Sequence, residues 1–190
     1  MKLKTGKKHI GMSSSGINKM TPNLQITIRP FKTEDIIDIH VYASNPETTK
    51  YMLWGPNTIE DTQGFLNYVF SQYSKTPITN FEHGIEYEGK IIGGIALIVD
   101  YEKKDAEIGW ILNEAYQRKG IMFQAAKEMI EFAKSIGVKT LHATADSRNV
   151  ASYKLMEKLG MKHIETRFQS RFNKVTKQTD LDEVYYEMTL

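Results

Sequence analysis

The chain has 190 residues, 41% of them hydrophobic, with a formal net charge of +2 and no cysteine. This length and composition favour one domain with a complete hydrophobic core, and they exclude disulfide bonds, thiolate metal sites and a cysteine acyl-enzyme. The longest apolar run, Ile91 to Val99, is too short to span a bilayer, and the first residues lack the apolar core of a signal peptide, so we expect a cytoplasmic protein with no membrane partner.

Positive charge gathers at the start of the chain. Residues 1–33 hold seven Lys and Arg and no acid, whereas the rest holds 18 Lys and Arg against 23 Asp and Glu. Residues 1–20 therefore predict a basic, disordered arm ahead of a folded domain over residues 24–190. The arm lacks interleaved aromatic residues, so we do not expect nucleic acid as a partner; a nucleic-acid-associated protein that uses the arm is one alternative. The acidic body suits a cationic substrate such as an amine.

The first elements of the domain predict a structural frame. A strand is expected over Gln25 to Arg29, followed by a helix over Glu34 to Ser44 with Thr33 as its cap. Thr58 to Asp61 resembles a capping box, which predicts that a second helix begins there. The apolar face of that helix is formed by Phe65, Leu66, Val69, Phe70 and Tyr73.

Three strands are expected next. Phe81 to Tyr87 and Ile91 to Asp100 have strand character and are joined by the turn Glu88-Gly89-Lys90, which predicts a hairpin. Ala106 to Leu112 supplies the fourth strand of the domain.

The turn Gln117-Arg118-Lys119-Gly120-Ile121-Met122 precedes a helix with apolar residues at helical spacing, which Gly137 ends. The first backbone N–H groups of a helix have no partner within it, and the helix dipole is positive at that end, so such a turn favours an anion. Gly120 allows a phosphate to approach the backbone, while Arg118 and Lys119 add positive charge. The turn predicts a pyrophosphate site, with a solvated surface turn as the alternative for so short a motif.

The last third of the chain predicts one more strand, a helix and a final hairpin. Val138 to Ala145 predicts a strand, and Asn149 occupies the cap position of a helix that Gly160 ends. Met161 to Phe172 and Leu181 to Thr189 predict a final hairpin.

Taken together, the Q-R-K-G-I-M turn, the strand about twenty residues later and N-V-A-S-Y-K-L-M-E-K-L-G-M resemble the GNAT superfamily of acetyl-CoA-dependent N-acetyltransferases. Ile28-Arg29-Pro30 and the segment from Tyr51 to Pro56 are similar to the RimJ/RimL-type branch, which acetylates the N-termini of ribosomal proteins. The resemblance covers roughly Leu24 to Leu190. It implies an α/β (α+β) fold with a central mixed, mostly antiparallel sheet of about seven strands, flanked by helices on both faces.

The sequence departs from the family pattern in two places that bear on chemistry. Met122 stands where the phosphate turn usually ends in Gly or Ala, so its side chain has to point away from the phosphate. Met156 stands where many relatives have a tyrosine that protonates the leaving thiolate, which excludes a tyrosine general acid from that position.

The resemblance also implies a set of site residues. Glu107 is the expected general base, with an ordinary exposed strand acid as the alternative, and Ser152 is expected to hydrogen-bond the leaving sulfur. The backbone N–H of Ile111 or a neighbour is expected to polarise the thioester carbonyl. The expected acetyl-CoA contacts are Ile111, Leu112, Gln117, Arg118, Lys119, Gly120, Ile121, Met122, Asn149 and Ser152.

The acceptor is left open by the sequence. A protein N-terminus, as in the RimJ/RimL-type branch, is the first expectation; a polyamine, an amino acid or an aminoglycoside is the alternative, as is a non-catalytic acetyl-CoA-binding module. The five histidines show no metal-ligand spacing, so no metal is expected. We expect a monomer or a homodimer.

Overall fold

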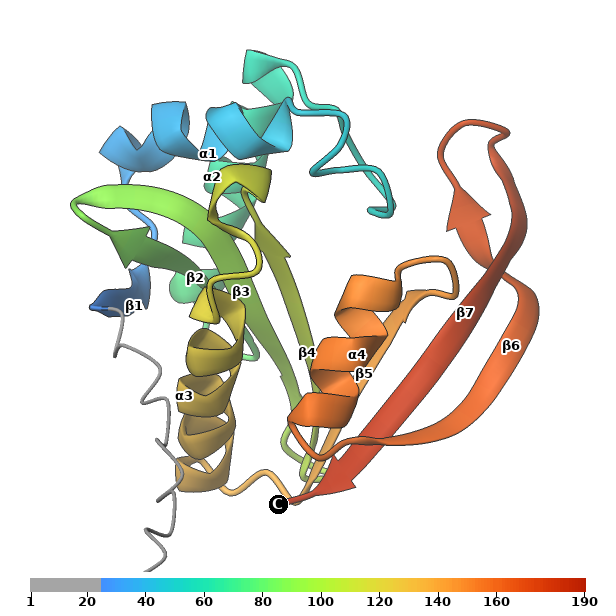
Figure 1. Cartoon of the computed structure of the whole chain (residues 1–190). Coiled ribbons are helices and arrows are strands. Elements are labelled where there is room, and N and C mark those ends of the chain that lie inside the picture. The colour runs from blue at the N-terminus through green and yellow to red at the C-terminus, as the bar shows by residue number, and fades with distance from the viewer. Residues whose placement is uncertain (1–24) are drawn as a thin grey trace, which may run out of the picture.

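The computed structural model describes residues 25–190, so the basic arm predicted for residues 1–20 lies outside the described residues (Figure 1). No helix in this range is long and apolar enough to cross a membrane. The strands are β1 (Ile26–Pro30), β2 (Asn80–Tyr87), β3 (Lys90–Asp100), β4 (Asp105–Leu112), β5 (Thr140–Asp146), β6 (Lys162–Asn173) and β7 (Gln178–Thr189). The helices are η1 (Thr33–Asp35), α1 (Ile36–Ala43), α2 (Ile59–Tyr73), η2 (Glu114–Tyr116), α3 (Ile121–Ser135) and α4 (Val150–Lys158).

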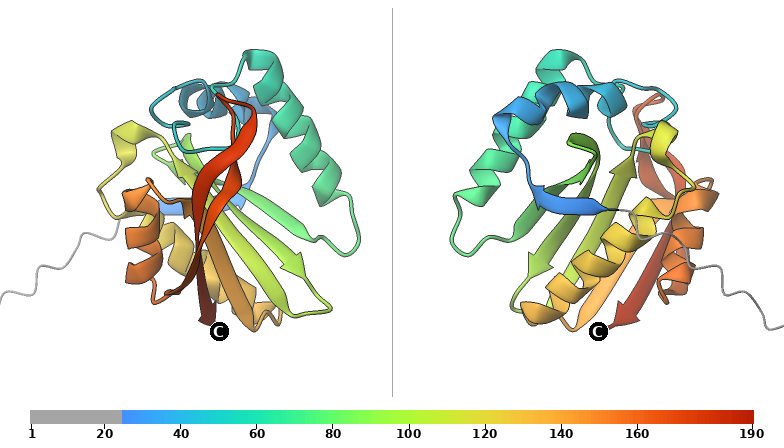
Figure 2. Two further views of the ribbon diagram at one scale, coloured as in Figure 1. Left: turned by 90° about the vertical axis from the view of Figure 1, so that its right-hand side faces the viewer. Right: turned by 60° about the vertical axis from the view of Figure 1, so that its left-hand side comes forward.

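All seven strands form one sheet in the order β1-β2-β3-β4-β5-β7-β6. Every neighbouring pair is antiparallel except β4 and β5, which are parallel. Helices α3 and α4 cover one face of the sheet, and α1 and α2 cover part of the other, as the two turned views in Figure 2 show. The predicted mixed, mostly antiparallel sheet with helices on both faces is therefore confirmed.

The core lies on both faces of the sheet. The larger part packs α3 and α4 against β3, β4 and β5, with Ile108, Ala125 and Leu141 among its least exposed residues. The smaller part packs α1 and α2 against β3 and the residue after β1, through Ile39, Leu66 and other apolar side chains. The predicted apolar face of α2 is confirmed, since all its members belong to this second cluster.

Of the three predicted N-terminal helix caps, those at Thr58 and Asn149 are correct and the one at Thr33 is not. The Thr58 hydroxyl accepts a hydrogen bond from the Asp61 N–H at 3.1 Å, and Asp61 accepts one from the Thr58 N–H at 2.9 Å, which is the predicted capping box. Thr33 does not cap its helix; it is the first residue of η1. Asp35 takes the capping role instead, because its carboxylate accepts the Lys32 N–H at 2.7 Å.

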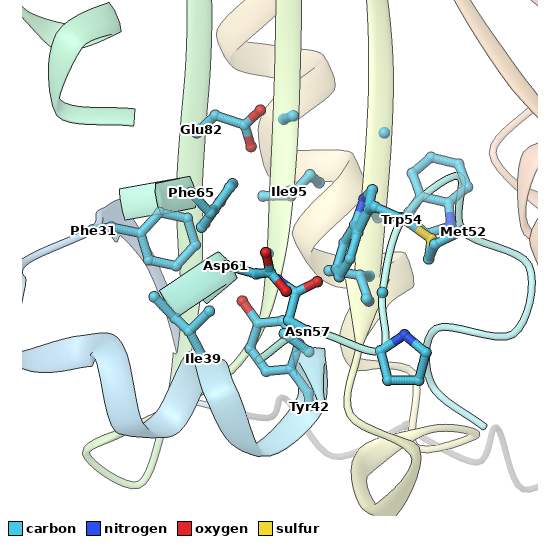
Figure 3. Close-up of a pocket in the computed structure, with 18 residues that line it drawn as sticks. Phe31, Ile39, Tyr42, Met52, Trp54, Asn57, Asp61, Phe65, Glu82 and Ile95 are labelled. Carbon is cyan, nitrogen blue, oxygen red and sulfur yellow. The ribbon is translucent and has the colours of Figure 1, made fainter. Parts of the chain in front are cut away.

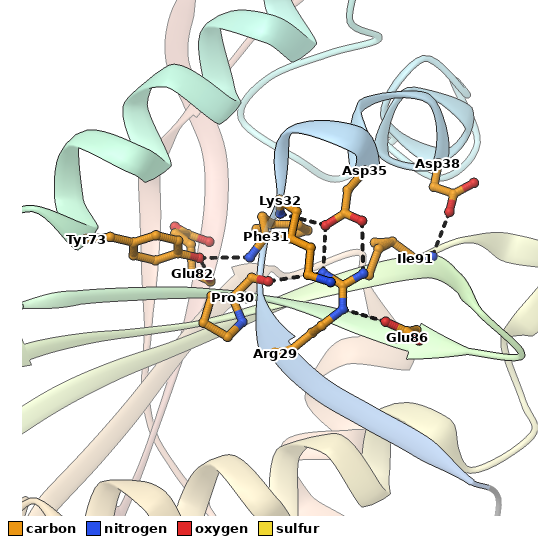
Figure 4. A network of polar contacts seen from close by, with 10 residues as sticks. All are labelled: Arg29, Pro30, Phe31, Lys32, Asp35, Asp38, Tyr73, Glu82, Glu86 and Ile91. Carbon is orange, nitrogen blue, oxygen red and sulfur yellow. Dashed lines mark hydrogen bonds and ion pairs between the residues drawn. The ribbon is translucent and has the colours of Figure 1, made fainter.

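Asp35 also fixes the first helices to the sheet. It is 4% exposed and accepts two hydrogen bonds from the Arg29 guanidinium, at 2.8 and 2.9 Å (Figure 4). Arg29 contacts Glu86 on β2 as well, and Asp38 of α1 accepts the Ile91 N–H of β3 at 2.9 Å. Burial opposes ionisation of Asp35, but these bonds hold its pKa below the usual value. The network sets the position of α1 over β2 and β3.

The parallel pair β4 and β5 separates soon after it begins. Only Asp105, Ala106 and Glu107 pair with β5, opposite Thr140, Leu141 and His142. Beyond Glu107 the two strands diverge, and β4 keeps only its antiparallel partner β3 (Figure 1). Residues 108–112 therefore present a strand edge that no other described strand occupies. Such an edge can pair with an extended ligand that carries amide groups.

Candidate active site

A cavity of about 460 Å³ opens at the start of α3, and we call it the turn cavity. It lies between the free edge of β4, the first turns of α3 and α4, and the segment that follows α1. Its lining comprises Glu47, Thr48, Tyr51, Met52, Trp110, Ile111, Leu112, Gln117, Arg118, Gly120, Ile121, Met122, Phe123, Asn149, Ala151, Ser152, Leu155 and Lys158.

The backbone at the start of α3 is arranged to hold an anion. Gly120 has a φ of +84°, and a Cβ placed there would meet nothing within 4 Å, so the space in front of it is open. The first helical hydrogen bond of α3 runs from the Gln124 N–H to the Gly120 carbonyl at 3.1 Å. The backbone N–H groups of residues 121 to 123 therefore have no hydrogen-bond partner within the helix. Gln117 closes the turn, because its Nε2 donates to the Leu112 carbonyl at 3.0 Å. These are the features that a phosphate-binding helix start requires.

The structure brings the predicted cofactor residues together, with one exception. All of them except Lys119 line the turn cavity; the Lys119 ammonium lies instead 5.1 Å from the centre of the Tyr116 ring. Met122 is 8% exposed and belongs to the core, so most of its bulk points away from the turn as its size requires.

Asn149 and Ser152 meet at the start of α4. The Asn149 Oδ1 accepts the Ser152 N–H at 3.2 Å, which fixes both residues at the wall of the turn cavity. The Ser152 hydroxyl makes no hydrogen bond to residues 25–190 and can donate one to a ligand. Met156 is 1% exposed in the core, and Tyr153 stacks on Tyr186 at 6.5 Å between ring centres.

Sequence reasoning missed two side chains of the turn cavity. Lys158, at the end of α4, has its ammonium 4.3 Å from the centre of the Phe123 ring, so it adds a second cation beside Arg118. The Thr48 hydroxyl is buried and has no partner within the described part of the chain. Lys158 lies within the signature from Asn149 to Met161, but the signature alone does not show that its side chain reaches the turn; Thr48 reaches the cavity from the segment after α1.

A second cavity, of about 510 Å³, lies between α1, α2 and the sheet, and we call it the apolar cavity (Figure 3). It shares Met52, Trp110 and Ile111 with the turn cavity, so the two meet on β4. The segment from Tyr51 to Pro56, which is similar to the RimJ/RimL-type branch, contributes Met52, Trp54, Gly55 and Pro56. The rest of the lining is Phe31, Ile39, Tyr42, Ala43, Asn57, Asp61, Phe65, Glu82, Gly94, Ile95, Ala96 and Gly109.

Two carboxylates deserve comparison at the apolar cavity. Glu107 does not line it but lies on β4 two residues before Gly109, which does. The Glu107 side chain is 43% exposed, and its carboxylate lies 4.0 Å from the His142 Nε2 and 3.4 Å from the Thr144 hydroxyl. Glu82, which sequence reasoning did not single out, lies inside the cavity. Burial raises the pKa of Glu82, opposed in part by a hydrogen bond from Asn80.

Comparison with known proteins decides the family. The model of the acetyltransferase (GNAT) domain matches residues 25–162. The chain belongs to the GNAT acetyltransferase family. This makes it an acyltransferase. Residues 25–190 contain no group of three or more His, Asp or Glu side chains arranged to hold a metal ion.

Individual relatives agree with the family. The chain is 30% identical over 139 residues to YnaD, an uncharacterized N-acetyltransferase of Bacillus subtilis (strain 168), covering 73% of this chain and 79% of that one. A GNAT-family acetyltransferase from Bacillus anthracis is 28% identical, with a TM-score of 0.72 over 86% of this chain and 94% of that one. RimL, a ribosomal L7/L12 alpha-N-protein acetyltransferase, superposes with a TM-score of 0.73 over 87% and 95% of the two chains. Its identity is 16%, so this likeness is one of fold alone.

Proposed function

We propose that the protein transfers the acetyl group of acetyl-CoA directly to an amine. The observation that carries the proposal is the start of α3, where an open Gly120 and three N–H groups outside the helical pattern face the turn cavity. A pyrophosphate fits this place, with Arg118 and Lys158 as counter-charges. The amide groups of the pantetheine arm fit the free edge of β4, which leads to Trp110 and Ile111, where the two cavities meet.

The acceptor amine enters from the apolar cavity. Its nitrogen attacks the thioester carbonyl carbon, a C–N bond forms and the C–S bond breaks. An amine that enters as an ammonium loses two protons in all, one before the attack, which makes the nitrogen a nucleophile, and one as the C–N bond forms; the departing sulfur gains one and the other is released to solvent. We assign the first proton to Glu107, which lies on the same face of β4 as Gly109, two residues or about 7 Å along the strand. The Ser152 hydroxyl hydrogen-bonds the sulfur as it departs, and the N–H of Ile111 or a neighbour polarises the carbonyl.

The shape of the apolar cavity favours a small-molecule amine over a protein N-terminus. Its volume of about 510 Å³ is in the range of small-ligand sites, and side chains from α1, α2 and the segment after α1 surround it. A RimJ/RimL-type activity was the first expectation from sequence, and the fold likeness to RimL does not by itself support it. The cytoplasmic location and the monomeric or dimeric state stay predictions.

Calorimetry of acetyl-CoA binding tests the proposal. Gly120→Glu places bulk and negative charge where the pyrophosphate lies, and we expect binding to be lost, with affinity lowered at least about 100-fold. Because Gly120 has a positive φ, Gly120→Gln is the matched control: it carries the same bulk and a comparable backbone cost without the charge. Unchanged affinity in a folded Gly120→Glu variant contradicts the assignment of the turn.

A further inference from the structure

The floor of the apolar cavity is built from very small residues. Gly94, Ala96 and Gly109 lie on adjacent strands and all line the cavity. A Cβ placed on Gly109 would meet nothing within 4 Å, so the space above this residue is open. The absence of larger side chains at these three positions creates the room between the sheet and the helices.

Strand register places Glu82 beside this floor. Glu82 pairs with Ala96, and Ala96 pairs with Gly109, so the three residues form one row across β2, β3 and β4. Two strand spacings separate the ends of the row, about 10 Å, and a glutamate side chain covers part of that distance. A nitrogen atom hydrogen-bonded to Glu82 therefore lies above Ala96 and Gly109, next to the segment of β4 where the turn cavity begins.

The walls of the apolar cavity are aromatic. Figure 3 shows Glu82 at one end, with Phe31 and Phe65 on one side and Trp54 on the other. Phe31 and Phe65 meet edge to face, with ring centres 5.6 Å apart, and Tyr42 is 2% exposed beneath them. Flat, rigid walls of this kind suit a planar or compact apolar group.

The charges of the apolar cavity are all negative. No Lys, Arg or His is among the residues that line it, and its acids are Glu82 and Asp61. Asp61 is exposed and caps α2, where its Oδ2 accepts the Thr58 N–H and hydroxyl at 2.9 and 3.0 Å. Glu82 forms no ion pair with any residue from 25 to 190, and it is the one carboxylate of this lining that is not exposed. One carboxylate in an apolar site matches one ammonium group.

We propose that the acceptor is a monoamine carried on a compact aromatic or alicyclic body, and that Glu82 is the residue that pairs with its ammonium group. This inference rests on the proposed acetyltransferase function and narrows its substrate class. A carboxylate on the acceptor is excluded, because no cation lines the cavity to receive it. A polyamine is disfavoured as well, since Asp61 is exposed and no second partly buried acid lines the cavity to pair with a further ammonium group there.

Acetylation of matched acceptors tests the substrate class. The probes are phenylethylamine, phenylalanine, spermidine and a short peptide with a free N-terminus, each with acetyl-CoA and detection of the released thiol. Phenylethylamine and phenylalanine share one body and differ by a carboxylate. We expect kcat/KM for phenylethylamine to exceed that for phenylalanine on the order of 100-fold, the cost of burying an unpaired charge. A higher kcat/KM for spermidine or the peptide overturns the inference.

Variants test the residues. Glu82→Gln keeps the shape and is expected to raise KM for phenylethylamine on the order of 100-fold, with little change in acetyl-CoA affinity. Glu102→Gln, an exposed acid in the turn after β3, is the control. Gly109→Leu fills the cavity and is expected to abolish acetylation of phenylethylamine, whereas Gly109→Ala adds one methyl group and costs less. Equal KM values for Glu82→Gln and the unaltered enzyme overturn the role of Glu82.

The two proposals fail in different ways. If the assignment of the acetyl-CoA site is wrong, calorimetry without any acceptor shows unchanged acetyl-CoA affinity in Gly120→Glu. That result concerns the turn cavity alone. Tight acetyl-CoA binding together with no acetylation of phenylethylamine overturns the acceptor class and leaves the donor site in place.

Discussion

At the scale of single residues, Glu82 lowers the stability of the folded chain, and in our proposal it binds the ammonium group of the acceptor. Burial raises its pKa, so ionised Glu82 is less favourable in the folded chain than in the unfolded one. This opposes folding at pH values above the unfolded pKa of about 4.3, and the opposition vanishes below it. An acid that weakens the fold and faces an apolar cavity is typical of a binding residue.

Glu82→Gln is therefore expected to raise the melting temperature at pH 7 while it lowers acceptor binding. The gain should shrink as the pH falls toward about 4 and disappear below it, because Glu82 is then protonated in both states. Thermal unfolding of the two proteins across this pH range measures the effect. A melting temperature that falls in Glu82→Gln, or a gain that does not change with pH, contradicts the sign of the pKa shift.

Glu107 and Glu82 are predicted to affect different kinetic constants. Glu107 is the proposed proton acceptor, so Glu107→Gln is expected to lower kcat by about 10² to 10⁴ with acceptor KM little changed. The loss should be largest at pH values where the amine is mostly protonated. Glu102→Gln, an exposed acid in the turn after β3 that lines neither cavity, is the control. Undiminished kcat in Glu107→Gln assigns proton removal to another group.

The sequence alone predicted a functional role for Glu107 but not for Glu82. Glu107 was singled out because it lies on the strand that leads into the phosphate turn, in a stretch that resembles a known family. Glu82 looks like any acid on a half-exposed strand. Its role depends on the register from β2 through β3 to β4 and on helices packed above, which are long-range features that no local pattern carries.

At the scale of elements, most boundaries followed from local chemistry. The hairpin turn at Glu88 and Gly89 and the ends of α3 and α4 at Gly137 and Gly160 are all made by residues with positive φ, which favours glycine. The cap expected at Thr33 was wrong because Asp35, held by Arg29, competes for the same backbone. An ion pair between the end of β1 and η1 thus overrides a cap preference that is worth only about 1 kcal/mol.

The β6–β7 hairpin supports the apolar cavity from a distance. Lys174, in its turn, donates hydrogen bonds to the Thr49 carbonyl at 2.6 Å and the Trp54 carbonyl at 2.8 Å. These carbonyls belong to the segment that places Met52 and Trp54 in the cavity wall. Burial lowers the pKa of Lys174, as expected for an ammonium group enclosed by backbone.

Lys174→Met is expected to raise acceptor KM about tenfold, because the segment loses two charged hydrogen bonds and Trp54 is held less firmly. Affinity for acetyl-CoA, measured by calorimetry, should change less, by about twofold, since the segment also lines the turn cavity but the proposed phosphate contacts at the start of α3 lie on other elements. Lys177→Met, in the same turn, is the control. Equal acceptor KM values in the two variants show that the hairpin does not position the cavity wall.

At the scale of the whole molecule, the function depends on the separation of β4 from β5. The sequence predicts both strands, but not that they pair over three residues and then diverge. That divergence frees one edge of β4 and lets the turn cavity and the apolar cavity reach Trp110 and Ile111 together. If donor and acceptor bind as proposed, they approach one short stretch of β4 from two cavities, so both can be bound at the same time.

Simultaneous binding predicts direct transfer through a ternary complex. The sequence contains no cysteine to carry the acetyl group, and the cavities join at the point of reaction. Double-reciprocal plots of initial rates at several fixed acceptor concentrations should intersect. Ser152→Ala should lower kcat by about tenfold without changing this pattern, since one neutral hydrogen bond to a leaving thiolate contributes about 1 to 1.5 kcal/mol. Parallel lines, together with an acetylated protein that forms with acetyl-CoA alone and passes its acetyl group to the amine, contradict direct transfer even if both cavities are correctly assigned.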